Sequence, residues 1–169
     1  MIVGIVGLGL IGGSFAKAYH EAGWKVLAHN RSRSVLDFAK ISGAVDDELT
    51  HENISECDLV LITVYPAAAA RYLEAAAPHI GKKPVVIDCC GTKRVVCKAC
   101  FPLAEKYGFT VKRSHKLRKT FATRLAAQKV ELETIRKILG HQDLKTTLGY
   151  IFESKDDRSE SLIDLATAS

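Results

Sequence analysis

Two periods of apolar and polar residues alternate along the first 110 residues of the chain. Short runs rich in β-branched residues predict buried strands, and apolar side chains spaced three or four apart predict amphipathic helices between them. Strands that alternate with helices in this way indicate a parallel sheet. The expected fold class is therefore α/β, with helices on both faces of the sheet. The expected strands are Ile2–Val6, Trp24–Ala28, Asp58–Thr63 and Pro84–Asp88, and the expected helices are Ser14–Ala22, Val35–Ile41 and Ala67–Ala77.

A different pattern begins near residue 111, where the strand period disappears. Two helical stripes follow, over Ser114–Gln128 and Glu131–Leu139, and Gly140 is placed to end the second. We therefore expect a parallel-sheet domain over residues 1–110 and a small all-α segment over residues 111–169. The apolar stripes could be covered by the sheet edge, by each other, or by a second copy of the chain in a homodimer. The residues expected to point inward are Leu117, Phe121, Leu125, Ala126, Leu132, Ile135, Ile138 and Leu139, and residues 153–169 are expected to form a partly frayed acidic helix.

A glycine-rich turn joins the first expected strand to the first expected helix. Gly7, Gly9 and Gly12 have the GxGxxG spacing of a Rossmann-type dinucleotide site. The first glycine permits a tight turn, the second allows backbone to approach a diphosphate, and the third allows the helix to pack closely on the strand. The diphosphate would then lie at the helix N-terminus, where free N–H groups and the helix dipole favour negative charge. Strand, spacing and helix all agree with this interpretation.

The segment after the second strand bears on which nicotinamide cofactor is bound. A carboxylate at this place would bind a ribose 2′-hydroxyl and repel a 2′-phosphate. The sequence has Asn30, Arg31, Ser32 and Arg33 there instead, so two guanidiniums and a hydroxyl could hold a phosphate. These residues favour NADP, with NAD as the other cofactor to consider. The alternative is an ordinary polar loop before a helix.

Charge is distributed unevenly along a chain whose formal net charge is +5. Residues 1–110 hold 12 basic and 11 acidic side chains, whereas residues 111–150 hold 10 basic and 3 acidic ones. A basic block of this kind is typical of contact with a nucleic-acid backbone, so DNA is a candidate partner through residues 111–150. A solvated basic surface is the equally weighted alternative.

The remaining composition narrows the setting of the protein. The longest apolar run, Leu59–Val64, is far shorter than the ~20 residues of a membrane-spanning helix, and we expect no membrane contact. The first residues have no basic leader, which predicts a cytoplasmic protein without a signal peptide. Its five cysteines are expected to be reduced thiols. Cys97 and Cys100 have CxxC spacing but no second ligand pair, so we expect no metal site.

Several motifs of the first 110 residues resemble the nucleotide-binding domain of prephenate and arogenate dehydrogenases. They are the segments 7–14, 86–93 and 104–109. This family oxidises and decarboxylates a cyclohexadienyl acid with NAD or NADP, and after its last strand it places a histidine that accepts the proton of the substrate hydroxyl. His115 stands at the matching offset, but Lys116, Leu117 and Arg118 follow it in place of the family's continuation, and the helical substrate domain is absent. The resemblance implies cofactor contacts from Gly7, Gly9, Leu10, Ile11, Gly12, Asn30, Arg31, Ser32, Asp88 and Thr92.

Residues 112–155 resemble the C-terminal catalytic segment of tyrosine recombinases, the phage integrase family. The matching residues are His115, Arg118, His141 and Tyr150. His141 comes 26 positions after His115, and Tyr150 comes 9 positions after His141. The resemblance implies that Tyr150 attacks a DNA phosphodiester to form a 3′-phosphotyrosyl link. Arg118 would stabilise charge on the phosphate, and His115 and His141 would donate hydrogen bonds or transfer protons. The family also uses an arginine and a lysine upstream of this segment, and neither has a counterpart in a matching motif here.

Three hypotheses follow for a chain that looks like a chimera of two families. It could be an NADP(H)-binding module of a dehydrogenase, or a protein that breaks and rejoins DNA in site-specific recombination. It could also be the non-catalytic product of a gene fusion or of a sequence-assembly error. We favour the third hypothesis, a non-catalytic product that still binds the cofactor. Neither the dehydrogenase site nor the recombinase site has all the residues of its family.

Overall fold

The computed structural model of the chain describes residues 1–90 and 93–152, with the backbone alone for residues 93–94, 113–118 and 152. The chain divides into two compact units, Met1–Ser114 and His115–Ser169. Each unit is described below by itself.

The first unit is built on a parallel sheet of six strands in the order β3-β2-β1-β4-β5-β6. The chain starts in the middle of the sheet, extends to one edge through β2 and β3, and returns through β4 to the other edge. This reversal leaves the carboxyl ends of β1 and β4 side by side, which is where ligands bind in open α/β sheets. The strands are β1 (Ile2–Val6), β2 (Lys25–His29), β3 (Asp47–Glu48), β4 (Leu59–Ile62), β5 (Val85–Asp88) and β6 (Thr110–Arg113).

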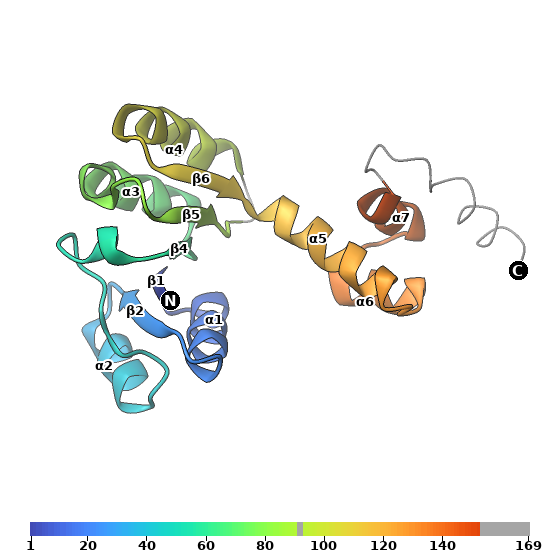
Figure 1. The fold of residues 1–169 in the computed structure, drawn as a ribbon, viewed down its shortest axis with the longest axis horizontal. Helices are drawn as coiled ribbons and strands as arrows, with labels where there is room; N and C mark the ends of the chain where they lie inside the picture. Colours follow the sequence, from blue (N-terminus) through green and yellow to red (C-terminus); the bar gives the residue numbers. More distant parts are fainter. Residues whose placement is uncertain (91–92, 153–169) are drawn as a thin grey trace, which may run out of the picture. The chain divides into compact units, whose positions relative to one another are not determined.

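Helices cover both faces of this sheet, because successive side chains of each strand point to opposite sides. On β4, Val60 and Ile62 pack in one apolar cluster with α3 and α4, whereas Leu61 packs in the other with α1 and α2. Figure 1 shows α3 and α4 beside β5 and β6, and α1 and α2 beside β1 and β2. The helices are α1 (Leu10–Glu21), α2 (Arg33–Ile41), α3 (Pro66–Ile80) and α4 (Lys93–Tyr107), with a short 3₁₀ helix, η1 (Ile54–Glu56).

The predicted α/β fold class is confirmed, and the differences lie at element ends and in elements that the expected set did not contain. Helix α1 begins at Leu10, four residues before the predicted start, because the apolar spacing becomes visible only after the glycines. Strand β3 was not predicted, since its two acidic residues carry no apolar alternation. Strand β6 pairs with β5 from Val85↔Thr110 to Asp88↔Arg113, so residues as far as 113 belong to the sheet.

The second unit contains three helices, α5 (Ser114–Ala127), α6 (Leu132–Leu139) and α7 (Leu144–Phe152). Its small core consists of Ala122, Ile135, Leu139 and Ile151, all buried. Gly140 ends α6 in the left-handed conformation with φ 67°, as predicted from its position.

Two residues predicted to point inward in this unit lie on the surface instead. Phe121 is 47% exposed and Ile138 is 54% exposed. In α6 the buried stripe is defined by Ile135 and Leu139, and Ile138 lies about 100° away from Leu139 around the helix. In α5 the inward position is taken by the small neighbour Ala122. The side chain of Leu117 and the predicted acidic helix over 153–169 lie outside the described residues.

Over residues 1–90 and 93–152, no helix combines the length and the apolar character that a membrane crossing requires.

Helix α2 offers a test of the core, because Leu36 is 1% exposed and Phe38 is 71% exposed on the same helix. We expect Leu36→Ala to lower the free energy of unfolding by about 2–5 kcal/mol, since it leaves a cavity against the sheet. The matched control Phe38→Ala should change it by less than about 0.5 kcal/mol. Urea unfolding followed by Trp24 fluorescence measures both. Equal effects would contradict the assignment of the buried face of α2.

Candidate nucleotide-binding site

The glycine turn continues directly from β1 at the carboxyl edge of the sheet. Gly7 has φ +97°, a conformation that strongly favours glycine, and its N–H donates to the carbonyl of His29 at 2.7 Å. Gly9 is extended and precedes the first residue of α1, and its carbonyl accepts from Gly13 N at 2.8 Å. The turn thus delivers the N-terminus of α1 to the edge where β1 and β4 end.

The contact between this turn and α1 leaves no room for a side chain at Gly12. A Cβ added there would overlap the carbonyl oxygen of Gly7 and the hydroxyl of Thr63. That hydroxyl lies 2.7 Å from the Gly7 oxygen and 2.9 Å from the Val6 oxygen, so it holds the turn from the end of β4. Sequence reasoning missed Thr63, because nothing in its local sequence shows a partner 56 residues away.

The space around Gly9 is open, in contrast to Gly7 and Gly12. No atom lies within 4 Å of a Cβ built on Gly9. The two residues that follow are exposed, Leu10 by 91% and Ile11 by 53%, and the first turn of α1 has no acidic residue. The backbone is therefore accessible to an anion at the positive end of the helix.

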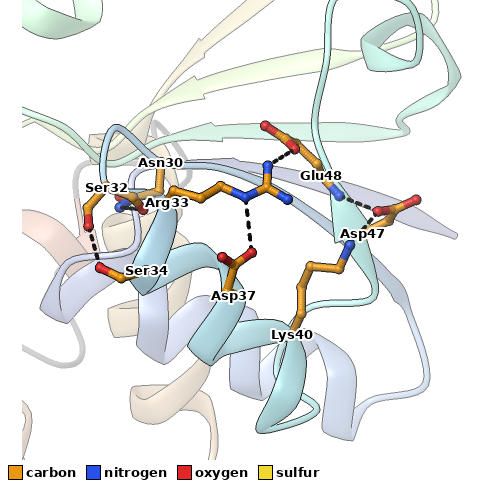
Figure 2. Close-up of polar contacts among 8 residues, drawn as sticks. All are labelled: Asn30, Ser32, Arg33, Ser34, Asp37, Lys40, Asp47 and Glu48. Carbon is orange, nitrogen blue, oxygen red and sulfur yellow. Dashed lines mark hydrogen bonds and ion pairs between the residues drawn. The ribbon is translucent and has the colours of Figure 1, made fainter.

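Asn30 connects this turn to the one that follows β2. Its side-chain oxygen accepts from Leu8 N at 3.0 Å, and its side-chain nitrogen donates to the carbonyl of Ser32 at 3.1 Å (Figure 2 shows Asn30 beside Ser32). Ser32 precedes α2, and its hydroxyl lies 2.9 Å from that of Ser34. The amide of Asn30 therefore fixes the position of the segment that carries Arg31.

The two arginines of this segment have different surroundings. Arg33 Nη1 lies 2.6 Å from Glu48 Oε2, and its Nε lies 3.0 Å from Asp37 Oδ1 (Figure 2). The hydrogen bond to Glu48 is the main cause that raises the pKa of Arg33. Arg31 is exposed, and within the described part of the chain its side chain has no hydrogen bond or ion pair.

His29 adds no positive charge to this end of β2. Burial lowers the pKa of this half-buried imidazole below its usual 6.5, although the charge of Glu48 raises it to a lesser extent and that of His51 lowers it further. The ring is therefore neutral at pH 7 and packs near Tyr72, with ring centroids 5.1 Å apart. Arg31 is an exposed cation of this turn that is available to a ligand.

Asp88 ends β5 and is 5% exposed. Its Oδ1 accepts from Cys90 N at 2.8 Å, which shapes the turn after the strand, and the Cys90 thiol donates to the carbonyl of Val64 at 2.9 Å. Thr92, the other residue predicted at this end, lies outside the described residues.

All five cysteines are free thiols. Burial is the main cause that raises the pKa of Cys57 and of Cys100 to about 11, so both are protonated at neutral pH. No cluster of three or more His, Cys, Asp or Glu residues suited to a metal ion occurs among the residues that the structure describes.

The helical unit brings together two of the four residues predicted from the recombinase resemblance. The rings of His141 and Tyr150 meet edge to face with centroids 4.8 Å apart. His141 Nδ1 lies 2.9 Å from the hydroxyl of the fully buried Thr147. His115 and Arg118 belong to α5, and their side chains lie outside the described residues.

Arg136 holds the turn that carries His141 and was missed from the sequence. Its guanidinium contacts both carboxylate oxygens of Glu133 at 2.7 and 2.9 Å and donates to the carbonyl of His141 at 2.6 Å. Asp143 then starts α7 by accepting from the backbone and side chain of Thr146, and these two hydrogen bonds are the main cause that lowers its pKa. The i, i+3 spacing of Glu133 and Arg136 was a usable signal.

Comparison with protein families identifies the first unit. The model of the NAD binding domain of 6-phosphogluconate dehydrogenase matches residues 2–111, which is well over half of the chain. The chain belongs to this family. Its first unit is an NAD(P)-binding domain of the dehydrogenase type, with the open glycine turn at the place where such domains bind dinucleotides. The phage integrase family model matches residues 92–156 and so overlaps the NAD-binding domain over residues 92–111.

Solved structures share the fold of this NAD-binding domain. An imine reductase of Streptomyces aurantiacus is 27% identical with a TM-score of 0.57, over 67% of this chain and 40% of that one. A 3-hydroxyisobutyrate dehydrogenase of Mycobacterium tuberculosis is 17% identical with a TM-score of 0.59, over 66% and 39%. The chain thus spans about 40% of the length of these two proteins. An arogenate dehydrogenase of Synechocystis is 14% identical with a TM-score of 0.55, over 99% and 91%. The comparison with curated proteins found no match.

The glycine turn predicts opposite effects for two neighbouring substitutions in α1. Gly12→Ala should lower the free energy of unfolding by at least about 2 kcal/mol, because the new methyl group overlaps Gly7 and Thr63. Gly13→Ala should raise it by about 0.5–1 kcal/mol, since the added Cβ meets no atom within 4 Å and alanine favours the helix. Urea unfolding of both variants tests this, and a destabilised Gly13→Ala would contradict the open position.

Proposed function

We propose that the chain binds NADP(H) in preference to NAD(H) through its first unit. The observation that carries this proposal is the exposed Arg31, which has no polar partner in the described chain. It lies between Asn30 and Ser32, and the side chain of Asn30 bonds to the backbone of Ser32 and to Leu8 of the accessible glycine turn. A guanidinium at this place can form two charge-assisted hydrogen bonds to a 2′-phosphate. The accessible amides at the start of α1 would bind the diphosphate. Gly7, Gly9, Leu10, Ile11, Gly12, Ser32, Asp88 and Thr92 complete the proposed set of cofactor contacts.

We further propose that this unit is of the prephenate and arogenate dehydrogenase type and that the chain binds its cofactor without full turnover. The motifs at 7–14, 86–93 and 104–109 support the first part. The integrase match over 92–156 supports the second, because it covers the region where those dehydrogenases begin their substrate domain. Hydride transfer needs a substrate that is held against the nicotinamide.

Titration of the full chain with NADPH and NADH tests the cofactor preference. We expect tighter binding of NADPH, and Arg31→Ala should weaken it roughly 10- to 100-fold because charge-assisted hydrogen bonds are lost. The affinity for NADH should change little. Arg71→Ala removes an exposed arginine on α3 and is the matched control. Equal affinities for the two cofactors, unchanged by Arg31→Ala, would refute the NADP assignment.

The second candidate function is DNA contact through residues 111–150, the region in which the recombinase resemblance implies that Tyr150 is the nucleophile. The integrase match supports it, as does the packing of Tyr150 on His141. His115 and Arg118 would act on the same phosphate. Exposed basic side chains of this region, among them Arg124 and Lys137, would contact the phosphate backbone. The upstream arginine and lysine of the recombinase family have no counterpart here, so we propose weak association without cleavage.

Fluorescence anisotropy with duplex DNA at several salt concentrations tests this association. We expect binding that weakens with salt, and Arg124→Gln combined with Lys137→Gln should reduce the magnitude of the log–log salt slope by about 2. Lys17→Gln combined with Lys98→Gln, in the first unit, is the control and should leave the slope unchanged. A covalent DNA adduct that Tyr150→Phe abolishes would show that the cleavage chemistry persists.

A further inference from the structure

A carboxylate lies close to the end of β2 although none follows that strand in the sequence. Strand β3 pairs with β2 in parallel, and the register places Glu48 opposite Ala28, one residue before the end of β2. The charge of Glu48 also acts on His29, the last residue of β2. In Rossmann-type sheets the end of the second strand is where an acidic residue selects the ribose 2′-hydroxyl of NAD. Glu48 reaches this neighbourhood from the adjacent strand.

Arg33 neutralises this carboxylate. Its Nη1 lies 2.6 Å from Glu48 Oε2, and its Nε is held by Asp37 at 3.0 Å from within the same helix. Figure 2 shows the guanidinium between the two carboxylates. Arg33 is the first residue of α2, and its ion pair with Asp37 orients the guanidinium toward Glu48.

We propose that Arg33 determines cofactor preference indirectly, by masking Glu48 as a latent selector for NAD. This inference rests on the proposed binding of a nicotinamide dinucleotide by the first unit. With Arg33 in place, the nearby carboxylate is paired and Arg31 can attract a 2′-phosphate. Without Arg33, the Glu48 carboxylate repels that phosphate and is free to accept hydrogen bonds from ribose hydroxyls.

The exposure of the pair determines the size of the expected effect. The side chain of Arg33 is 65% exposed and that of Glu48 is 37% exposed, so solvent and salt screen their charges. The effect on affinity is therefore moderate and should decrease as ionic strength rises. A direct contact of Arg33 with the phosphate would instead give a loss that does not depend on Glu48.

A double-mutant cycle on the full chain separates these two roles. Affinities for NADPH and NADH are measured at about 20 mM salt for the native chain, Arg33→Ala, Glu48→Gln and the double variant. We expect Arg33→Ala to lower the NADPH-to-NADH affinity ratio roughly fivefold to tenfold. Removal of the Glu48 charge in the double variant should restore the native ratio within about twofold.

Lys40→Ala is the matched control, because Lys40 pairs with Asp47 at 2.8 Å across the same α2–β3 contact. Figure 2 shows this ion pair beside that of Arg33. Its loss removes an equivalent ion pair and should leave the affinity ratio unchanged, so a general weakening of the α2–β3 contact is distinguished from masking. Thermal unfolding of each variant verifies that the chain remains folded.

The possible results separate the inference from the function on which it rests. An unchanged ratio in Arg33→Ala, or an equal loss of NADPH affinity with and without the Glu48 charge, overturns the masking role while dinucleotide binding stands. If the native chain binds neither NADPH nor NADH, the proposed function fails and the inference fails with it.

Discussion

The close contact between the glycine turn and the first helix is the constraint on which the nucleotide-binding unit depends. Gly12 lies against the carbonyl of Gly7, and the Thr63 hydroxyl bonds to the same turn from β4. Because no side chain separates helix from turn, the N-terminus of α1 is held at the carboxyl edge of the sheet. The site for an anion is thus made by two neighbouring strands together, and not by the glycine motif alone.

Most of this unit could be predicted from the sequence, because β1, β2, β4 and β5 are largely buried and its helices are amphipathic. Both properties leave periodic patterns that local reading detects. Strand β3 left no such pattern, since Asp47 and Glu48 form a two-residue edge strand of charged side chains. The site was predictable where one residue type is required by backbone geometry, as at Gly7 and Gly12. It was not predictable where a partner is distant in sequence, as with Thr63 or with Arg33 and Glu48.

The helical unit shows a different limit of sequence reasoning. Helical spacing predicted α5 and α6 but left the inward face uncertain by one residue, so Phe121 and Ile138 were assigned to the wrong side. In a small core only a narrow stripe of each helix is buried. A short helix has few apolar residues from which the position of that stripe can be predicted. The spacing of His141 and Tyr150, by contrast, did bring two rings into contact, because an intervening turn and one helix fix their separation.

The two family matches overlap over residues 92–111, most of which belong to α4 and β6. Residues 92–111 match both models, yet α4 packs in the apolar cluster of α3, and β6 pairs with β5 along its full length. Packing against the sheet therefore assigns this stretch to the nucleotide-binding unit.

The two hydrogen bonds of the Asn30 side chain matter for any attempt to exchange cofactor-binding loops between such domains. One amide bonds simultaneously to the backbone of Leu8 and of Ser32. The glycine turn, which would bind the diphosphate, and the segment after β2, which would contact the adenosine ribose, are thus held in a fixed relative position. Replacement of residues 31–34 alone would keep both hydrogen bonds of Asn30. Replacement of Asn30 by a residue with neither a side-chain donor nor a side-chain acceptor would remove both, so both segments would lose their fixed position together.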